Sequence, residues 1–113
     1  MLIRLLKLSP QNPAHKIQLV GGGFCLVDAA DFDWLNKFCW RRKKNHSGFY
    51  AYTRKQIKGK MHYVYMHRLI SKTPKWLKTH HINHNGLDNR RENLSVITER
   101  EHRHFDGWHY FEQ

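Results

Sequence analysis

The sequence is poor in cysteine, and its two cysteines are not arranged as a metal-binding pair. Cys25 and Cys39 stand alone, each in an apolar stretch (GFCLV and KFCW), and the chain has no CxxC. Apolar neighbours favour buried free thiols in a reducing compartment. A disulfide and a Cys–His zinc site remain open as less favoured alternatives.

Long apolar runs are also missing, which argues against a membrane protein. The N-terminal stretch MLIRLLKL contains Arg4 and Lys7, and it is too short for a transmembrane helix or the apolar core of a secretory signal. The basic residues do not line one amphipathic helix opposite an apolar face, as binding to a membrane surface would require. We therefore expect a cytoplasmic protein with no membrane partner.

Acidic residues are scarce relative to basic ones. Nine Asp and Glu stand against twenty Lys and Arg, which gives a formal net charge of +11 and a pI near 10.0. This excess is larger than solubility requires in a small domain, and it attracts polyanions. Together with 13% aromatic residues, the charge predicts a nucleic acid as the partner.

Residues 1–75 are predicted to be rich in β-structure. Short apolar runs separated by turn-forming residues predict strands at 3–8, 17–20 and 24–27. Asp28 can cap a short helix after them. Two aromatic runs, Phe49–Thr53 and Met61–Tyr65, flank a Lys-Gly-Lys turn and predict an antiparallel hairpin. Met66–Ser71 could form a further short helix that ends before Pro74.

Basic residues lie just before this hairpin and within it. Cationic side chains beside a pleated aromatic surface suit the backbone or a groove of duplex DNA. The alternative is a half-exposed sheet whose tyrosines pack while its lysines keep it soluble. We interpret residues 1–75 as a β-rich, basic, DNA-contacting region, and the candidate contacts in it are Arg41, Arg42, Lys43, Lys44 and Arg54.

Residues 76–113 predict a strand, a loop, a second strand and a short helix. The segment from Trp76 to Ile82 starts apolar and ends in two histidines, and the polar run 83–92 contains the turn formers Asn-Gly and Asp-Asn. Residues 94–98 alternate in polarity as a strand does. Thr98-Glu99-Arg100-Glu101 matches a capping box, so we expect a helix from residue 99 to about residue 106.

Two adjacent histidines end the first of these strands. Because successive strand residues point to opposite faces, His80 and His81 cannot serve one purpose. One of them can bind a metal together with His102 in the helix, while the other faces a substrate. Asn93 begins the second strand, where it could face His81. A structural zinc site is the rival interpretation, but it normally needs four protein ligands, and His84 and Cys39 are poor candidates for the others.

His81, Asn93 and His102, separated by 12 and then 9 positions, resemble the His-Asn-His signature of HNH endonucleases, the ββα-metal fold. HHINHNGLDNRRENLSVIT is most similar to phage and intron-borne HNH homing endonucleases, whose core typically reads Asp-His-Ile-Asn-Gly-Asn followed by Leu-Asp-Asn-Arg-Arg-Glu-Asn-Leu. The upstream MHRLI and VDAADFDWLNKFCW extend the resemblance over about residues 17–104. The expected fold class is α+β, with a small N-terminal antiparallel β-sheet and a short helix followed by a ββα-metal motif at 76–113 in one compact unit.

The resemblance implies a metal-dependent endonuclease that hydrolyses double-stranded DNA by nicking or by double-strand cleavage. His81 would be the general base, and Asn93 would orient its ring. His80 and His102 would ligate one divalent cation at the scissile phosphate. The loop arginines Arg90 and Arg91, and more weakly Arg68, would contact backbone phosphates. His67 is undecided between a packed residue and a phosphate contact.

Two departures from the family pattern concern the metal. His80 stands where many relatives have Asp, and His102 where they often have Asn. The expected cation is Mg²⁺ or Mn²⁺. Because imidazole ligands shift the preference away from Mg²⁺, Ni²⁺, Co²⁺ and Zn²⁺ are alternatives. We expect a phage-encoded monomer or homodimer in the cytoplasm of a bacterial host. The competing hypothesis is a non-catalytic DNA-binding accessory protein with a decayed or structural metal site.

Overall fold

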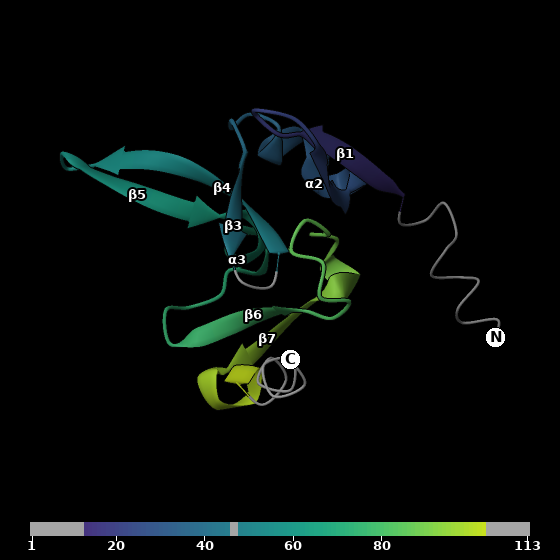
Figure 1. Ribbon diagram of the computed structural model, residues 1–113, viewed down its shortest axis with the longest axis vertical. Coiled ribbons are helices and arrows are strands. Elements are labelled where there is room, and N and C mark those ends of the chain that lie inside the picture. The colour runs from purple at the N-terminus through teal and green to yellow at the C-terminus, as the bar shows by residue number, and fades with distance from the viewer. Residues whose placement is uncertain (1–12, 46–47, 104–113) are drawn as a thin grey trace.

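The computed structural model describes residues 13–45 and 48–103. In these residues the chain forms a small α+β fold of three antiparallel β-sheets connected by short helices (Figure 1). None of the helices described in this part of the chain is long and apolar enough to cross a membrane. The strand expected at 3–8 and the end of the C-terminal helix near residue 106 lie outside the described residues.

The first sheet pairs β1 (Ala14–Gln18) with β2 (Phe24–Asp28). The glycines at 21–23 all have positive φ, from 79° to 118°, and this backbone conformation explains why glycines occupy the connection. Helix α2 (Ala29–Leu35) follows at once, as predicted, and Asp28 occupies its N-cap position. The side chain of Asp28 does not cap the helix, however, because it accepts a hydrogen bond from the backbone N–H of Arg91 at 3.3 Å.

The second sheet has the order β3 (Arg41–Asn45), β4 (Gly48–Ile57) and β5 (Lys60–Tyr65). The predicted hairpin is confirmed, with Tyr52 opposite Tyr65 and Ile57 opposite Lys60. The basic tract at 41–44 is itself a strand of this sheet. Helix α3 (Met66–Ser71) follows β5, as predicted, and lies between this sheet and the C-terminal hairpin (Figure 1).

The third sheet pairs β6 (Leu77–His81) with β7 (Leu94–Thr98), joined by a loop that ends in the 3-10 turn η1 (Arg91–Asn93). Residues 99–103 are helical. The capping box is present as predicted, because the Glu101 N–H donates to Thr98 Oγ1 at 3.1 Å and the Thr98 N–H donates to Glu101 Oε1 at 3.0 Å. The described C-terminal segment is therefore strand, loop, strand and helix.

The apolar core lies among the N-terminal elements and α3. It contains Ile17, Leu19, Cys25, Val27, Leu35, Trp40, Ala51, Met66 and Ile70. Burial raises the pKa of the Cys25 thiol to about 12, so this thiol stays protonated and unreactive, whereas Cys39 is exposed. The C-terminal hairpin is joined to the core through its loop, which pairs with β2. The Leu26 N–H donates to Leu87 O at 2.8 Å, and the Asn89 N–H donates to Leu26 O at 2.7 Å.

Candidate active site

The paired histidines at the end of β6 face opposite sides of their sheet, as strand alternation predicts. His81 is 5% exposed and turns toward the three-stranded sheet. There its ring stacks on Tyr50, with centroids 5.6 Å apart, and meets His67 at 4.9 Å. His80 lies on the other side, with its ring centroid 6.2 Å from that of His102. The structure therefore brings His80 and His102 together, and both of them line one small pocket with His81 and Tyr50.

The orientation of His81 is fixed by a buried amide. Its Nε2 lies 2.8 Å from Oδ1 of Asn89, a fully buried residue. An amide oxygen can only accept, so Nε2 carries the proton and Nδ1 is the basic nitrogen of the ring. Asn89 is itself held by its backbone bond to β2. His81 therefore has one defined tautomer, set by the loop and by a strand more than fifty positions earlier in the sequence.

Asn93 does not take the position that the sequence analysis predicted. Its Nδ2 donates to Asn83 Oδ1 at 2.9 Å and to Asp88 O at 2.8 Å, and its Oδ1 accepts from the Asn83 N–H at 2.9 Å. The expected contact across the strand pair is wrong because strand pairing begins at His81 and Leu94, so Asn93 still belongs to the loop. Asn93 holds the loop closed, and Asn89 holds the histidine.

The two loop arginines are engaged by carboxylates of the same chain. Arg90 donates to both oxygens of Asp88, each at 2.7 Å. Arg91 donates to both oxygens of Asp31, each at 2.8 Å. These bidentate pairs join the loop to itself and to α2. The hydrogen bonds from Arg91 lower the pKa of Asp31; although burial acts to raise the pKa of Asp88, its bonds with Arg90 lower it.

These ion pairs make the loop arginines weaker candidates for contacts with DNA. A bidentate partner of nearly buried Asp31 or Asp88 already has its charge compensated, so binding a phosphate would require it to break or share that pair. The contact of Arg90 and Arg91 with phosphate stays a prediction, but their structural role was missed in the sequence. The sequence shows arginines in the loop and an aspartate in α2, but no short-range pattern indicates that they pair with each other.

Strand alternation divides the basic tract between two faces. Lys43 lies opposite Tyr50, and Arg41 lies opposite Tyr52, so these cations share a face with the tyrosines and with the histidine site. Arg54, opposite Tyr63, belongs to the same face. Arg42 and Lys44 point the other way, and the Arg42 guanidinium lies 5.2 Å from the centre of the Phe49 ring. Half of the tract that the sequence singled out is therefore near the site.

His67, which the sequence left undecided, lies in α3 beside His81. It is 7% exposed, and its Nδ1 has no hydrogen-bond partner among the described residues. Burial, together with the neighbouring charges of His81, Arg68 and His102, lowers the pKa of His67 to about 3. His67 is therefore neutral at physiological pH, and it packs the base of the site without adding charge.

The residues expected to bind a metal lie near one another on β6 and in the C-terminal helix. Within 13–45 and 48–103, no group of three or more His, Cys, Asp or Glu is arranged to hold an ion. The His80 and His102 rings do approach each other, and the His84 ring lies 5.2 Å from that of His80. Imidazoles placed in this way fit a catalytic ion that takes further ligands from water and substrate.

The fold and the site together define a small, basic α+β protein with a histidine-lined site between two β-hairpins. Comparisons of the chain with models of protein families, with curated proteins and with solved structures found no match. The chemistry of the site and the sequence resemblance to HNH endonucleases are therefore what bears on its function.

Proposed function

We propose that this protein is a metal-dependent DNA endonuclease of the HNH type, which hydrolyses phosphodiester bonds in double-stranded DNA. The observation that supports it most is the group of histidines at the end of β6. His81, with its tautomer fixed by Asn89, lines one small pocket with His80 and His102, whose rings lie 6.2 Å apart. The strand, loop, strand and helix at 77–103 are consistent with the ββα-metal arrangement that the motif implies.

His81 is proposed as the general base. Its Nδ1 would take the proton of the attacking water, a role that suits imidazole because it can accept a proton near neutral pH. The Nε2–H bond to Asn89 would stabilise the imidazolium that forms. The stacked Tyr50 and the neutral His67 keep the ring from turning.

His80 and His102 are proposed to hold one divalent ion. When bound, the ion would offset the negative charge that develops on the phosphate and on the leaving oxygen. The imidazole pair would favour Mn²⁺, Co²⁺, Ni²⁺ or Zn²⁺ relative to Mg²⁺. Asn93 contributes indirectly, because its amide closes the loop that carries Asn89.

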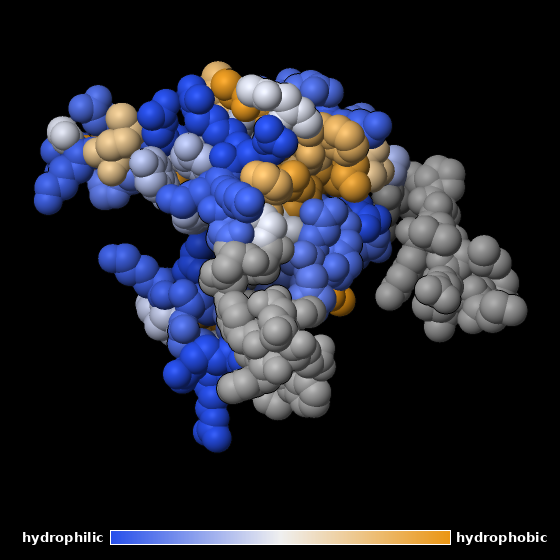
Figure 2. All heavy atoms as spheres, viewed as in Figure 1, coloured by the Kyte–Doolittle hydropathy of each residue, from blue (hydrophilic) through white to orange (hydrophobic). Residues whose placement is uncertain are grey.

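The substrate class is supported by charge and shape. The β4–β5 ribbon projects beyond the rest of the described chain (Figure 1), and its surface is largely hydrophilic (Figure 2). Three lysines, Lys55, Lys58 and Lys60, are exposed on it. The DNA major groove admits a two-stranded β-ribbon, and cations along it would contact the phosphates on either side. We therefore propose duplex DNA as the substrate.

Cleavage of supercoiled plasmid tests the proposal. The protein should convert the plasmid to nicked or linear forms with Mg²⁺, Mn²⁺ or Ni²⁺ and should not do so in EDTA. His81→Ala should lower the rate by about 10²- to 10⁴-fold, since it removes the base. Asn89→Ala should lower it by about 10- to 100-fold, because the ring loses its orienting bond. His15→Ala, an exposed histidine on β1, is the matched control and should cut normally.

The same assay distinguishes the proposed endonuclease from the competing hypothesis of a non-catalytic DNA-binding protein. If no metal supports cleavage by the wild-type protein while a gel shift with duplex DNA persists, the chain is a non-catalytic DNA-binding protein. If His81→Ala cuts as fast as wild type, the proposed base is wrong.

A further inference from the structure

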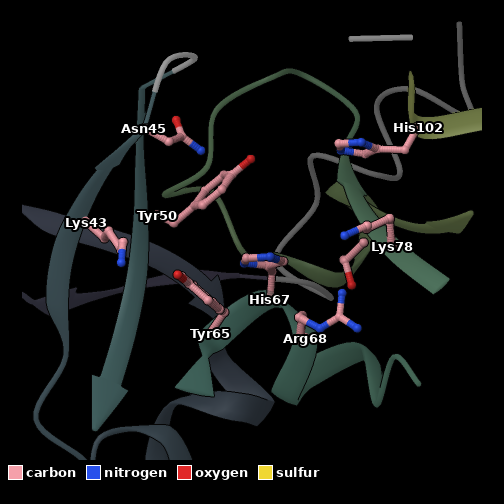
Figure 3. A pocket seen from close by; sticks show the side chains of 9 residues that line it. Lys43, Asn45, Tyr50, Tyr65, His67, Arg68, Lys78 and His102 are labelled. Atoms are coloured by element: carbon pink, nitrogen blue, oxygen red, sulfur yellow. The ribbon is translucent and has the colours of Figure 1, made fainter. Parts of the chain in front are cut away.

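A pocket of about 280 Å³ lies beside the paired histidines, between the three-stranded sheet and β6. Its walls come from separate parts of the chain. Lys43, Tyr50 and Tyr65 project from the sheet, Lys78 projects from β6, and Arg68 with His67 comes from α3 (Figure 3). None of the described residues that line it is an aspartate or a glutamate.

The charges around this pocket suit an anion. Lys43, Arg68 and Lys78 are cations from three different elements, and repulsion among them opposes their convergence unless an anion is bound. Inside the protein these cations have partners that are largely open to solvent or uncharged. The Lys43 ammonium lies 4.8 Å from the centre of the exposed Tyr63 ring. The ion pair between Lys78 and Glu99, at 3.3 Å, has both side chains largely in solvent, where such pairs contribute little. Arg68 uses one of its N–H groups on Pro74 O at 2.9 Å and keeps others for a ligand.

The rest of the lining consists of tyrosine, asparagine, threonine and histidine side chains, which narrows the class of anion. Tyr50 and Tyr65 line the cavity (Figure 3), and their hydroxyl groups can donate or accept hydrogen bonds. The rings of Tyr50 and Tyr65 pack edge to face, with centroids 6.2 Å apart, so they form one continuous wall. A cavity of this volume has room for more than a bare phosphate group, and a sugar can pack against such a wall.

The pocket is continuous with the histidine site. His102 belongs to its lining, and His67 on its floor is 4.9 Å from His81 between ring centroids. We infer that this pocket binds the sugar–phosphate unit of the nucleotide that adjoins the bond to be cleaved. The position of that unit relative to the cleaved bond depends on the proposed function, whereas the binding of a nucleotide phosphate does not.

Binding of thymidine 5′-monophosphate in EDTA tests this inference without any metal or catalysis. Titration followed by calorimetry or by NMR chemical shifts should give one site per chain. Thymidine, which lacks the phosphate, and inorganic phosphate, which lacks the sugar, should each bind at least about tenfold more weakly, a difference expected when a charged hydrogen bond or a packed group is lost.

Two neighbouring lysines of β3 provide the matched variants. Lys43→Ala removes a cation from the pocket and should weaken binding of the nucleotide roughly tenfold. Lys44→Ala removes the same charge from the opposite face of the strand and should leave the affinity unchanged. Circular dichroism should show both variants folded. If thymidine binds as tightly as its phosphate, or if both variants bind alike, the inference is wrong.

Plasmid cleavage distinguishes failure of this inference from failure of the proposed function. If wild type binds the nucleotide but cuts no DNA with any metal, the phosphate site stands and the endonuclease proposal falls. If wild type cuts DNA and Lys43→Ala cuts with the same kcat/KM as Lys44→Ala, the pocket does not hold the substrate and the inference falls alone.

Discussion

At the scale of single residues, the site depends on groups that hold an imidazole rather than on the imidazole alone. Asn89 fixes the tautomer of His81, and Tyr50 and His67 pack its ring. Gly86 permits this packing, because a Cβ there would lie 2.1 Å from the carbonyl oxygen of Phe49. The loop can approach Tyr50 so closely only without a side chain at that position.

His67 gives the fold a predictable sensitivity to acid. Its pKa is about 3 in the folded protein and near 6.5 when exposed, so the unfolded chain takes up the proton first as the pH falls. This contribution to stability is complete above about pH 6.5 and decreases below it, by up to about 1.4 kcal/mol per pH unit. Urea unfolding in EDTA at pH 7.5 and 5.5 should therefore show a loss of about 1 kcal/mol.

Replacing His67 separates its effect from that of the other histidines. His67→Phe keeps an aromatic ring against Tyr50 and Tyr65 but cannot be protonated, so its loss of stability between these pH values should be smaller than that of wild type. His15→Ala, on the exposed edge of β1, should retain the full loss. Equal losses in wild type and His67→Phe would contradict the assignment.

At the scale of elements, the loop between β6 and β7 is the part that joins the site to the core. It pairs with β2 through Leu26 and with α2 through the ion pair of Arg91 and Asp31. The Asp31 side chain is nearly buried and also accepts a bond from Trp34 at 3.0 Å. Arg91 therefore anchors the loop that carries Asn89.

Removal of this anchor should destabilise the fold. Arg91→Ala leaves the carboxylate of Asp31 without its bidentate partner, and the expected loss is about 1–2 kcal/mol in unfolding free energy, since the arginine side is partly in solvent. The pKa of Asp31 is lowered from 3.8 in the folded protein, so this stability is present above pH 3.8 and is lost as the pH falls below it. The difference between variant and wild type should therefore narrow in that range.

Chemical denaturation at pH 7 and pH 3 measures both effects. Arg100→Ala, an exposed arginine in the helix at 99–103, is the matched control and should change the unfolding free energy by less than about 0.5 kcal/mol. A loss from Arg91→Ala no larger than that of the control would show that the ion pair does not anchor the loop.

At the scale of the whole molecule, the charge of +11 should make the proposed binding to DNA strongly salt-dependent, because each phosphate contact releases counterions. The tyrosine face of the three-stranded sheet, which includes Arg54, lies toward the site. Arg54→Ala should reduce the slope of log Kd against log salt concentration by about one. Arg42→Ala, on the opposite face over Phe49, should leave the slope nearly unchanged, and fluorescence anisotropy with a labelled duplex measures both. A larger change for Arg42 than for Arg54 would reverse the assignment of the binding face.

Much of the fold follows from short-range patterns in the sequence. The hairpin of β4 and β5, the helix α3, the loop and β7 lie where alternation and turn residues predict them. The capping box at Thr98 and Glu101 is formed as predicted. These features are set by residues a few positions apart, so a single sequence contains the information. The opposite orientation of His80 and His81 was predictable for the same reason.

The partners of the site residues were decided only by the tertiary structure. Asn89 rather than Asn93 bonds to His81, and Arg91 pairs with Asp31 at a separation of 60 positions. The pocket beside the histidines gathers cations from β3, α3 and β6, which no local pattern relates to one another. The sequence by itself determined the strands, the loop and the helix on which the candidate side chains lie. How loop residues meet them depends on packing between distant segments, because a loop has no periodicity from which the direction of a side chain can be inferred.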